Sequence, residues 1–230
     1  MNLRLKGVIF DMDGVLVDSE PFICKAACMM FAERGIEVQP EDFEPFVGMG
    51  EERYIGGVAE KYSHEVDILQ VKKRTYDIYL EIIVGALEPL PGVFEFIEEC
   101  KAKGLRLAVA SSADLRKVEG NLVEIGLPLD SFDAVITGDD VENKKPAPDI
   151  FLMAAERIGL DAADCLVVED AVSGVEAAKA AGAQCLGITS SFTEEQLKGA
   201  DFLARDLASV ERCLLGVLAT MPRKCSSPLR

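Results

Sequence analysis

Short, nearly continuous apolar runs alternate with helical patterns along this chain, and this alternation limits the possible folds more than any other feature. The runs are Lys6–Phe10, Leu105–Ala110, Ala134–Thr137, Cys165–Val168 and Gln184–Ile188. Short runs rich in β-branched residues are typical of strands that are covered on both faces. Helical patterns that stop before a glycine separate the later runs. The sequence therefore predicts an α/β fold with a doubly wound parallel sheet.

The stretch between the first two runs contains only helical patterns. This much helix is too long for a single crossover between neighbouring strands. We therefore expect a helical subdomain over residues 17–87, inserted into a core that is formed by residues 1–16 and 88–220. Pro89 and Pro91 mark the return of the chain to the core.

The charge of the chain limits its partners, because 40 acidic residues against 24 basic ones give a formal net charge of −16. Such a field repels the phosphates of nucleic acids and anionic membrane surfaces, so neither is an expected partner. A small anionic substrate is still compatible with this charge, since a nearby cation or a bound metal can outweigh distant acids.

Cysteine usage and the lack of long apolar segments bear on the compartment. None of the seven cysteines forms a CxxC pair, and several lie inside apolar runs, so we expect free thiols in a reducing environment. No apolar run approaches the length of a transmembrane helix, and the first residues do not resemble a signal peptide. These features predict a cytoplasmic protein, with residues 221–230 as a flexible tail.

Polar side chains follow four of the apolar runs, at the point where each strand is expected to end. They are Asp11-Met12-Asp13-Gly14, Ser111-Ser112, Thr137 with Lys145 a few residues beyond, and Glu169-Asp170. Ligands bind outside the carboxyl ends of the strands in an open parallel sheet. Acids, hydroxyls and a lysine gathered at that edge are what phosphoryl transfer with a divalent metal requires.

Each of these side chains can be given a chemical role. Asp11 is the first residue beyond its strand, so it is best placed to attack phosphorus and form an aspartyl phosphate. Asp13 can protonate the leaving oxygen and then activate water. Ser111, with Ser112 beside it, and Lys145 can bind the phosphoryl oxygens. Asp170 can hold Mg²⁺ together with Asp11, because this hard cation prefers oxygen ligands.

The same residue types also occur for purely structural reasons. Acids and serines at strand ends often cap the next helix, and a lone lysine is usually an exposed one. A receiver-like signalling module also uses acids, a hydroxyl and a lysine around a phosphorylated aspartate, and a ligand-binding scaffold could keep the fold without turnover. An enzyme is favoured because the nucleophile, the acid, the hydroxyl, the lysine and the metal-binding acids of one mechanism are all present and follow the strands in turn.

The motifs that carry a family resemblance are Asp11 to Val15, Ser111, Lys145-Pro146, and Val167 to Asp170 followed by Gly174. With them, the chain resembles the haloacid dehalogenase superfamily from Val8 to about Leu207. The stretches KPAPDIF and VEDAVSGVEAA, and the inserted helices, are similar to the β-phosphoglucomutase-like branch. The resemblance implies a Rossmann-like core and a mobile helical cap, the name used below for residues 17–87.

The resemblance also implies a metal site and a reaction type. Mg²⁺ would be held by the Asp11 carboxylate, the Asp13 backbone carbonyl and Asp170, with Glu169 as a further ligand or a neighbouring acid. Family members that act on carbon–halogen bonds lack an acid at the position of Asp13, so dehalogenation is not expected. The family analogy favours a small phosphorylated metabolite, such as a sugar phosphate, as the substrate.

The choice between a phosphatase and a phosphomutase depends on the cations that a second phosphate would need. Ile23, Glu51 and Asp114 stand where the mutases carry a histidine, an arginine and a lysine. We therefore predict a phosphatase, a phosphoric monoester hydrolase, with a β-phosphoglucomutase-like phosphomutase as the alternative. A monomer or weak dimer is expected.

Four cap residues are candidates for substrate contact. Lys73 matches a cap lysine of the branch, and Gly48, Glu51 and Arg53 belong to a glycine-containing segment that could form a specificity loop. A solvated helix face and a plain flexible turn account for these residues equally well.

Overall fold

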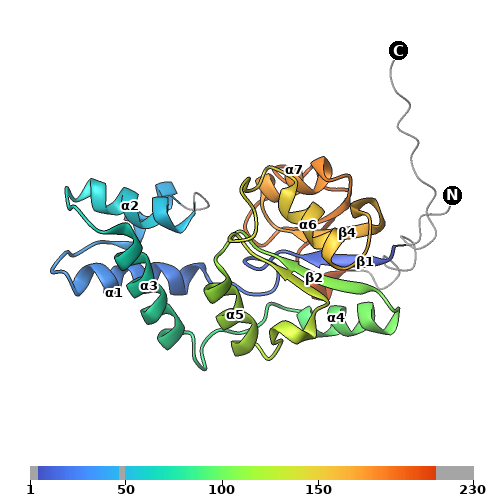
Figure 1. Cartoon of the computed structure of the whole chain (residues 1–230), viewed down its shortest axis with the longest axis horizontal. Coiled ribbons are helices and arrows are strands. Elements are labelled where there is room, and N and C mark those ends of the chain that lie inside the picture. Colours follow the sequence, from blue (N-terminus) through green and yellow to red (C-terminus); the bar gives the residue numbers. More distant parts are fainter. Residues whose placement is uncertain (1–4, 47–49, 211–230) are drawn as a thin grey trace, which may run out of the picture.

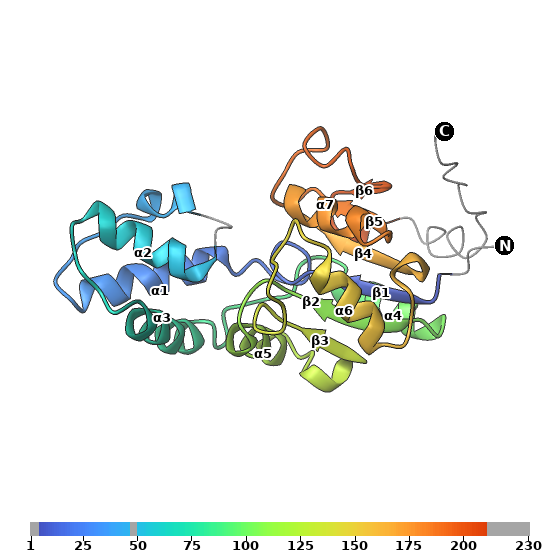
Figure 2. The ribbon, with the colours of Figure 1, turned by 45° about the horizontal axis from the view of Figure 1, so that its top comes forward.

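The core of the protein is a parallel sheet with the strand order β3-β2-β1-β4-β5-β6 (Figure 2). The computed structural model describes residues 5–46 and 50–210. The strands are β1 (Gly7–Phe10), β2 (Arg106–Ala110), β3 (Ala134–Ile136), β4 (Cys165–Glu169), β5 (Gln184–Ile188) and β6 (Phe202–Ala204). All neighbouring strands pair in parallel, so the predicted α/β, Rossmann-like fold is confirmed.

Helices cover both faces of this sheet, with α4 and α5 on one face and α6 and α7 on the other (Figure 1). They are α4 (Val93–Ala102), α5 (Leu115–Glu124), α6 (Asp149–Arg157) and α7 (Val172–Ala180). The central strand β1 packs against both layers, because its side chains alternate between the faces. Phe10 belongs to the same buried cluster as Phe96 of α4, whereas Ile9 belongs to the cluster of Phe151 from α6.

The strand β6 is absent from the sequence prediction. It has only three residues, which lie at the edge of the sheet and are partly or fully exposed. It therefore lacks the continuous apolar run by which the other five strands were recognised.

The cap is an all-helical layer beside the core in both views (Figures 1 and 2). It contains α1 (Glu20–Ala32), α2 (Glu51–Lys61), α3 (Ile68–Ile82) and two short 3₁₀ turns, Pro40–Asp42 and Glu44–Phe46. An aromatic contact joins these parts, since the ring centroids of Phe43 and Tyr54 lie 4.8 Å apart. The boundaries given above for core, cap and tail stay predictions, and residues 221–230 lie outside the described residues.

The two segments that connect cap and core lie side by side. Val17 forms an antiparallel bridge with Pro89, and the backbone N–H of Leu90 donates to the carbonyl oxygen of Leu16 at 2.9 Å. Further contacts join α3 of the cap to α5 of the core, where Arg116 binds Asp77 at 2.5 Å. The contacts described so far thus attach the cap through a paired linker and through packing of α3 against α5.

Asp42 is a buried acid of the cap that joins several of its parts by hydrogen bonds, and only 7% of its surface is exposed. It accepts hydrogen bonds from the backbone N–H of Gln39 at 2.8 Å, from the Tyr62 hydroxyl at 2.6 Å and from the Lys61 ammonium. These donors lower the pKa of Asp42 to about 2. A folded-state pKa below the unfolded one means that the ionised carboxylate stabilises the cap above about pH 4.

Asp42→Asn is therefore expected to lower the unfolding temperature at pH 7 by a small amount, within about 4 °C. The difference from the wild type should shrink as the pH falls from about 4 towards 2, because the wild-type carboxylate is then protonated. Thermal unfolding of both proteins at pH 7, 5 and 3 checks this. A difference that does not change with pH would contradict the assigned contacts.

Candidate active site

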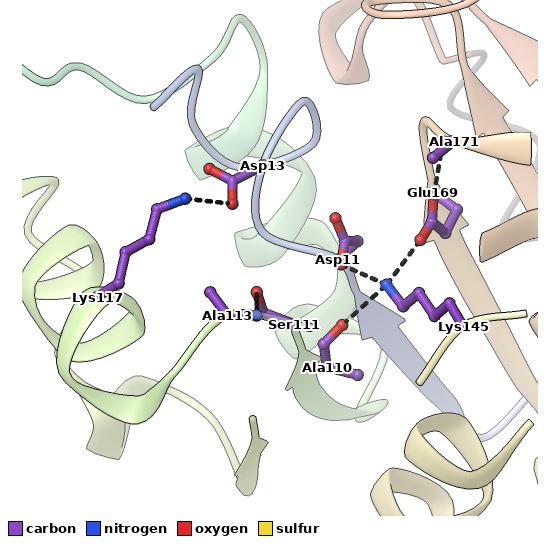
Figure 3. A network of polar contacts seen from close by, with 9 residues as sticks. All are labelled: Asp11, Asp13, Ala110, Ser111, Ala113, Lys117, Lys145, Glu169 and Ala171. Atoms are coloured by element: carbon purple, nitrogen blue, oxygen red, sulfur yellow. Dashed lines mark hydrogen bonds and ion pairs between the residues drawn. The ribbon is translucent and has the colours of Figure 1, made fainter. Parts of the chain in front are cut away.

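The loop after β1 places Asp11 beside a buried lysine (Figure 3). The Nζ atom of Lys145 donates to Oδ1 of Asp11 at 2.5 Å, to Oε1 of Glu169 at 2.7 Å and to the carbonyl oxygen of Ala110 at 3.3 Å. Burial alone would lower the pKa of Lys145, but Asp11 and Glu169 raise it above its ordinary value. The ammonium group is thus charged at neutral pH and holds two acids from adjacent strands together.

Three buried acids meet at this point. One carboxylate oxygen from each of Asp11, Glu169 and Asp170 lies within 4.8 Å of the others. Burial raises the pKa of Asp11 well above its ordinary value, although Lys145 lowers it. Burial and then Glu169 raise the pKa of Asp170 to about 7. Two of these three carboxylates pair with the Lys145 ammonium and the third, Asp170, has no such pair among the described contacts. Such an excess of hard, negative oxygen donors fits a divalent cation such as Mg²⁺.

Two glycines make room for these acids. Gly14 has a φ of +74°, and a Cβ atom there would overlap the carboxylate of Asp170. A Cβ atom on Gly174 would overlap the carboxylate of Glu169 in the same way. The acids therefore reach the end of the sheet only because both positions lack a side chain.

Ser111 follows β2 and is buried near Asp11 (Figure 3). Its hydroxyl oxygen accepts the backbone N–H of Ala113 at 3.2 Å, which leaves the O–H free to donate. For Ser112, the structure shows a contact of the backbone, whose carbonyl oxygen accepts from Nζ of Lys144 at 3.4 Å. The structure thus brings Ser111 towards the acids and Lys145, as the sequence predicts.

Asp13 points away from Asp11, towards the cap side of the site (Figure 3). Its Oδ2 atom accepts from Nζ of Lys117 at 3.0 Å, and its Oδ1 atom accepts from the hydroxyl of Ser19. Lys117, a buried residue of α5, is absent from the site that the sequence predicts. The sequence carries no signal for this burial, because a lysine on a helix is ordinarily assigned to the exposed face. The structure places it with Val118 and Asn121 among the buried residues of α5.

The cap candidates are not gathered at the acids. Arg53 pairs with Glu60 at 2.8 Å and lies over the ring of Phe46, so its described contacts stay within the cap. Lys73 is exposed on α3. Gly48 and the side chain of Glu51 lie outside the described residues.

Lys73 also lines a cavity of about 520 Å³ between α3 and α5. Asp114, which also lines this cavity and which replaces a lysine of the mutases, pairs with Lys72 at 2.7 Å. Ile23, at the position of the mutase histidine, is buried in the cap.

Comparisons with known proteins identify the family of the chain. A haloacid dehalogenase-like hydrolase family model matches residues 5–182. Protein SUPPRESSOR OF QUENCHING 1, chloroplastic, from Arabidopsis thaliana is 46% identical over 200 residues, which are 86% of this chain and 19% of the plant protein. This chain thus spans about a fifth of the length of that relative.

Two bacterial relatives match over most of their own length. The Phosphorylated carbohydrates phosphatase of Thermotoga maritima is 32% identical over 191 residues, covering 83% of this chain and 88% of that protein. The crystal structure of CbbY from Rhodobacter sphaeroides in complex with phosphate superposes with a TM-score of 0.79 at 28% identity, covering 89% of this chain and 95% of that one.

The parallel α/β core carries a carboxylate, a lysine and a second pair of acids at its carboxyl edge, and the family whose model matches the chain is one of hydrolases. The chain belongs to the haloacid dehalogenase-like hydrolase family, as the residues predict. The predicted enzyme class, a phosphoric monoester hydrolase, is confirmed at the level of the family and of relatives named as phosphatases. Within residues 5–46 and 50–210, every helix is too short or too polar to cross a bilayer.

Proposed function

We propose that the chain is a Mg²⁺-dependent phosphatase that works through an aspartyl phosphate on Asp11. The observation that carries the proposal is the contact of 2.5 Å between Oδ1 of Asp11 and Nζ of Lys145 at the end of β1. Lys145 orients the attacking carboxylate and offsets negative charge where the phosphoryl group arrives. The hydroxyl of Ser111 donates to an oxygen of that group.

The proposed reaction has two steps. In the first, the Asp11 carboxylate forms a bond to phosphorus while the bond to the leaving oxygen breaks, and protonated Asp13 gives that oxygen its proton. In the second, the Asp13 carboxylate takes a proton from water as the water oxygen bonds to phosphorus. Cleavage of the acyl phosphate then releases inorganic phosphate and regenerates both carboxyl groups.

Asp11, Asp170 and the backbone carbonyl of Asp13 are the groups proposed to hold Mg²⁺. The bound ion would offset charge on the phosphoryl oxygens. Glu169 has a different task in this proposal, because its Oε1 accepts from Lys145 and its Oε2 accepts from the backbone N–H of Ala171 at 2.7 Å. Both oxygens are engaged, so Glu169 positions the lysine and adds charge near the metal.

The proposed substrate is a small phosphorylated metabolite, with sugar phosphates first among the candidates. Two observations support this choice: a cap stands beside the site, and a relative is named as a phosphatase of phosphorylated carbohydrates. We also infer a cytoplasmic location, which the free thiols of the five described cysteines support. A monomer or weak dimer stays a prediction.

Hydrolysis is favoured over phosphate transfer within the substrate. A mutase holds two phosphates at once, but Ile23 is buried and Asp114 is an acid already paired with Lys72. Neither position offers a cation for a second phosphate.

The proposal is tested by measuring inorganic phosphate released from a panel of phosphorylated sugars, polyols and nucleotides, with Mg²⁺ and with a chelator. We expect metal-dependent release from one chemical group, with the sugar and polyol phosphates as the leading one. Conversion of sugar 1-phosphates to 6-phosphates without release would favour the mutase instead.

A further inference from the structure

We propose that Lys117 is a positioning residue for Asp13, which it holds on the side of the site where the leaving group departs. This inference rests on the proposed function, in which Asp13 protonates the leaving oxygen. Lys117 belongs to α5 of the core and to none of the motifs from which the family was recognised. Its role follows from the groups that surround its ammonium.

The contacts of Asp13 use both of its carboxylate oxygens. Lys117 donates to Oδ2 at 3.0 Å, and the Ser19 hydroxyl donates to Oδ1. The side chain of Asp13 is 35% exposed, so its remaining lone pairs are open to a substrate, whereas the side chain of Lys117 is only 6% exposed. The buried ammonium of Lys117 therefore restrains the Asp13 carboxylate, while the exposed part of that carboxylate stays accessible to a substrate.

The ammonium of Lys117 lies close to a cap side chain. It lies 6.0 Å from the centroid of the Tyr79 ring, and the hydroxyl of Tyr79 donates to Oδ1 of Asn121. Lys117 and Asn121 are one turn apart on α5, so they lie on the same face of that helix. The cap helix α3 thus packs against the core side chain that orients Asp13.

This arrangement matters because proton transfer requires the acid within hydrogen-bond reach of the departing oxygen. Asp13 lies only two residues after Asp11, yet the two carboxylates point to different groups (Figure 3). Without Lys117, the Asp13 side chain keeps one restraint, from Ser19, and can rotate away from the leaving oxygen. The resulting fall in kcat/KM should then depend on how much a given leaving group needs a proton.

The leaving-group dependence separates this role from a cation that binds the substrate. We would measure kcat/KM, which covers the steps up to release of the alcohol, for phenyl phosphate and p-nitrophenyl phosphate with wild type and Lys117→Met. The two substrates have nearly the same shape, but p-nitrophenolate leaves readily without a proton. We expect kcat/KM to fall by about 10- to 100-fold for phenyl phosphate and by less than about threefold for p-nitrophenyl phosphate.

Three further variants make the test specific. Lys117→Arg, which keeps a cation, should recover much of the lost rate on phenyl phosphate. Adding Lys117→Met to Asp13→Asn should cause no further loss, because both changes remove the same contribution. Lys101→Met, an exposed lysine of α4 that pairs with Glu98, is the matched control and should behave as wild type.

The positioning role would be overturned if Lys117→Met lowered kcat/KM equally on both substrates. It would also be overturned if Lys117→Met lowered kcat/KM of the Asp13→Asn variant by the same factor as it lowers that of the wild type. An unchanged kcat/KM in folded Lys117→Met would overturn it as well. These outcomes differ from a failure of the proposed function, in which the wild type itself would release no phosphate from either substrate.

Discussion

Asp11→Asn is expected to abolish phosphate release, with kcat at least about a thousandfold below that of the wild type. The amide has almost the shape of the carboxylate but is a far weaker nucleophile, so no acyl phosphate can form. Release of inorganic phosphate from the best substrate of the panel, with Mg²⁺ present, is the measurement. Turnover at the wild-type level would show that another group attacks phosphorus.

The unfolding temperature of Asp11→Asn shows whether lost activity comes from the missing nucleophile or from misfolding. Burial among other acids raises the pKa of Asp11, so loss of its charge should leave the metal-free protein equally stable or more stable. A lower unfolding temperature would mean that the variant lost activity through misfolding. Asp130→Asn changes an exposed acid outside the site and is the matched control, expected to keep full activity.

Lys145→Met is expected to lower the free energy of unfolding by about 3–5 kcal/mol and to remove most activity. The side chain of Lys145 is 8% exposed and pairs with Asp11 and Glu169. Methionine fills a similar volume but leaves those acids, together with Asp170, buried without a compensating cation. Urea denaturation of the two proteins without metal measures the loss directly.

The pH and Mg²⁺ dependence of this loss identify its cause. Lys145 lowers the pKa of Asp11 and of Asp170, so without it both values lie still further above their ordinary range in the folded state. The folded state then binds more protons than the unfolded chain, and its stability should fall as the pH rises from 6 to 8. Added Mg²⁺ should restore part of the stability by replacing the missing positive charge. A loss below about 1 kcal/mol, or one independent of both conditions, would show that Lys145 does not compensate the acids.

The acidic part of the site could be predicted because it depends on topology alone. Asp11 follows β1, Glu169 is the last residue of β4 and Asp170 follows it, and these two strands pair in parallel, so the three side chains lie at one edge of the sheet. Apolar runs identified both strands, and no knowledge of side-chain conformation was needed. Lys145 was predicted from its place shortly after the third apolar run and from the family resemblance, and in the structure its ammonium contacts Asp11 and Glu169.

The part of the site near Asp13 could not be predicted in this way. Lys117 is buried on a helix whose sequence pattern marks only its apolar positions, and a lysine is ordinarily assigned to the exposed face. The Tyr79 ring of the cap helix α3 lies near its ammonium and comes from a distant part of the sequence. For Arg53, the sequence left open whether it reaches the active site, and in the structure it pairs with Glu60 within the cap.

The pairing of Val17 with Pro89 has a consequence for how such an enzyme can diversify. An insertion whose two ends are adjacent adds little loop-closure entropy to the folding of its host, whatever its length. The groups assigned to phosphate chemistry, Asp11, Ser111 and Lys145, all lie outside that insertion. Exchange of the insert can therefore change selectivity for the alcohol without moving these three groups, but it also changes the Ser19 and Tyr79 contacts that reach Asp13 and Lys117.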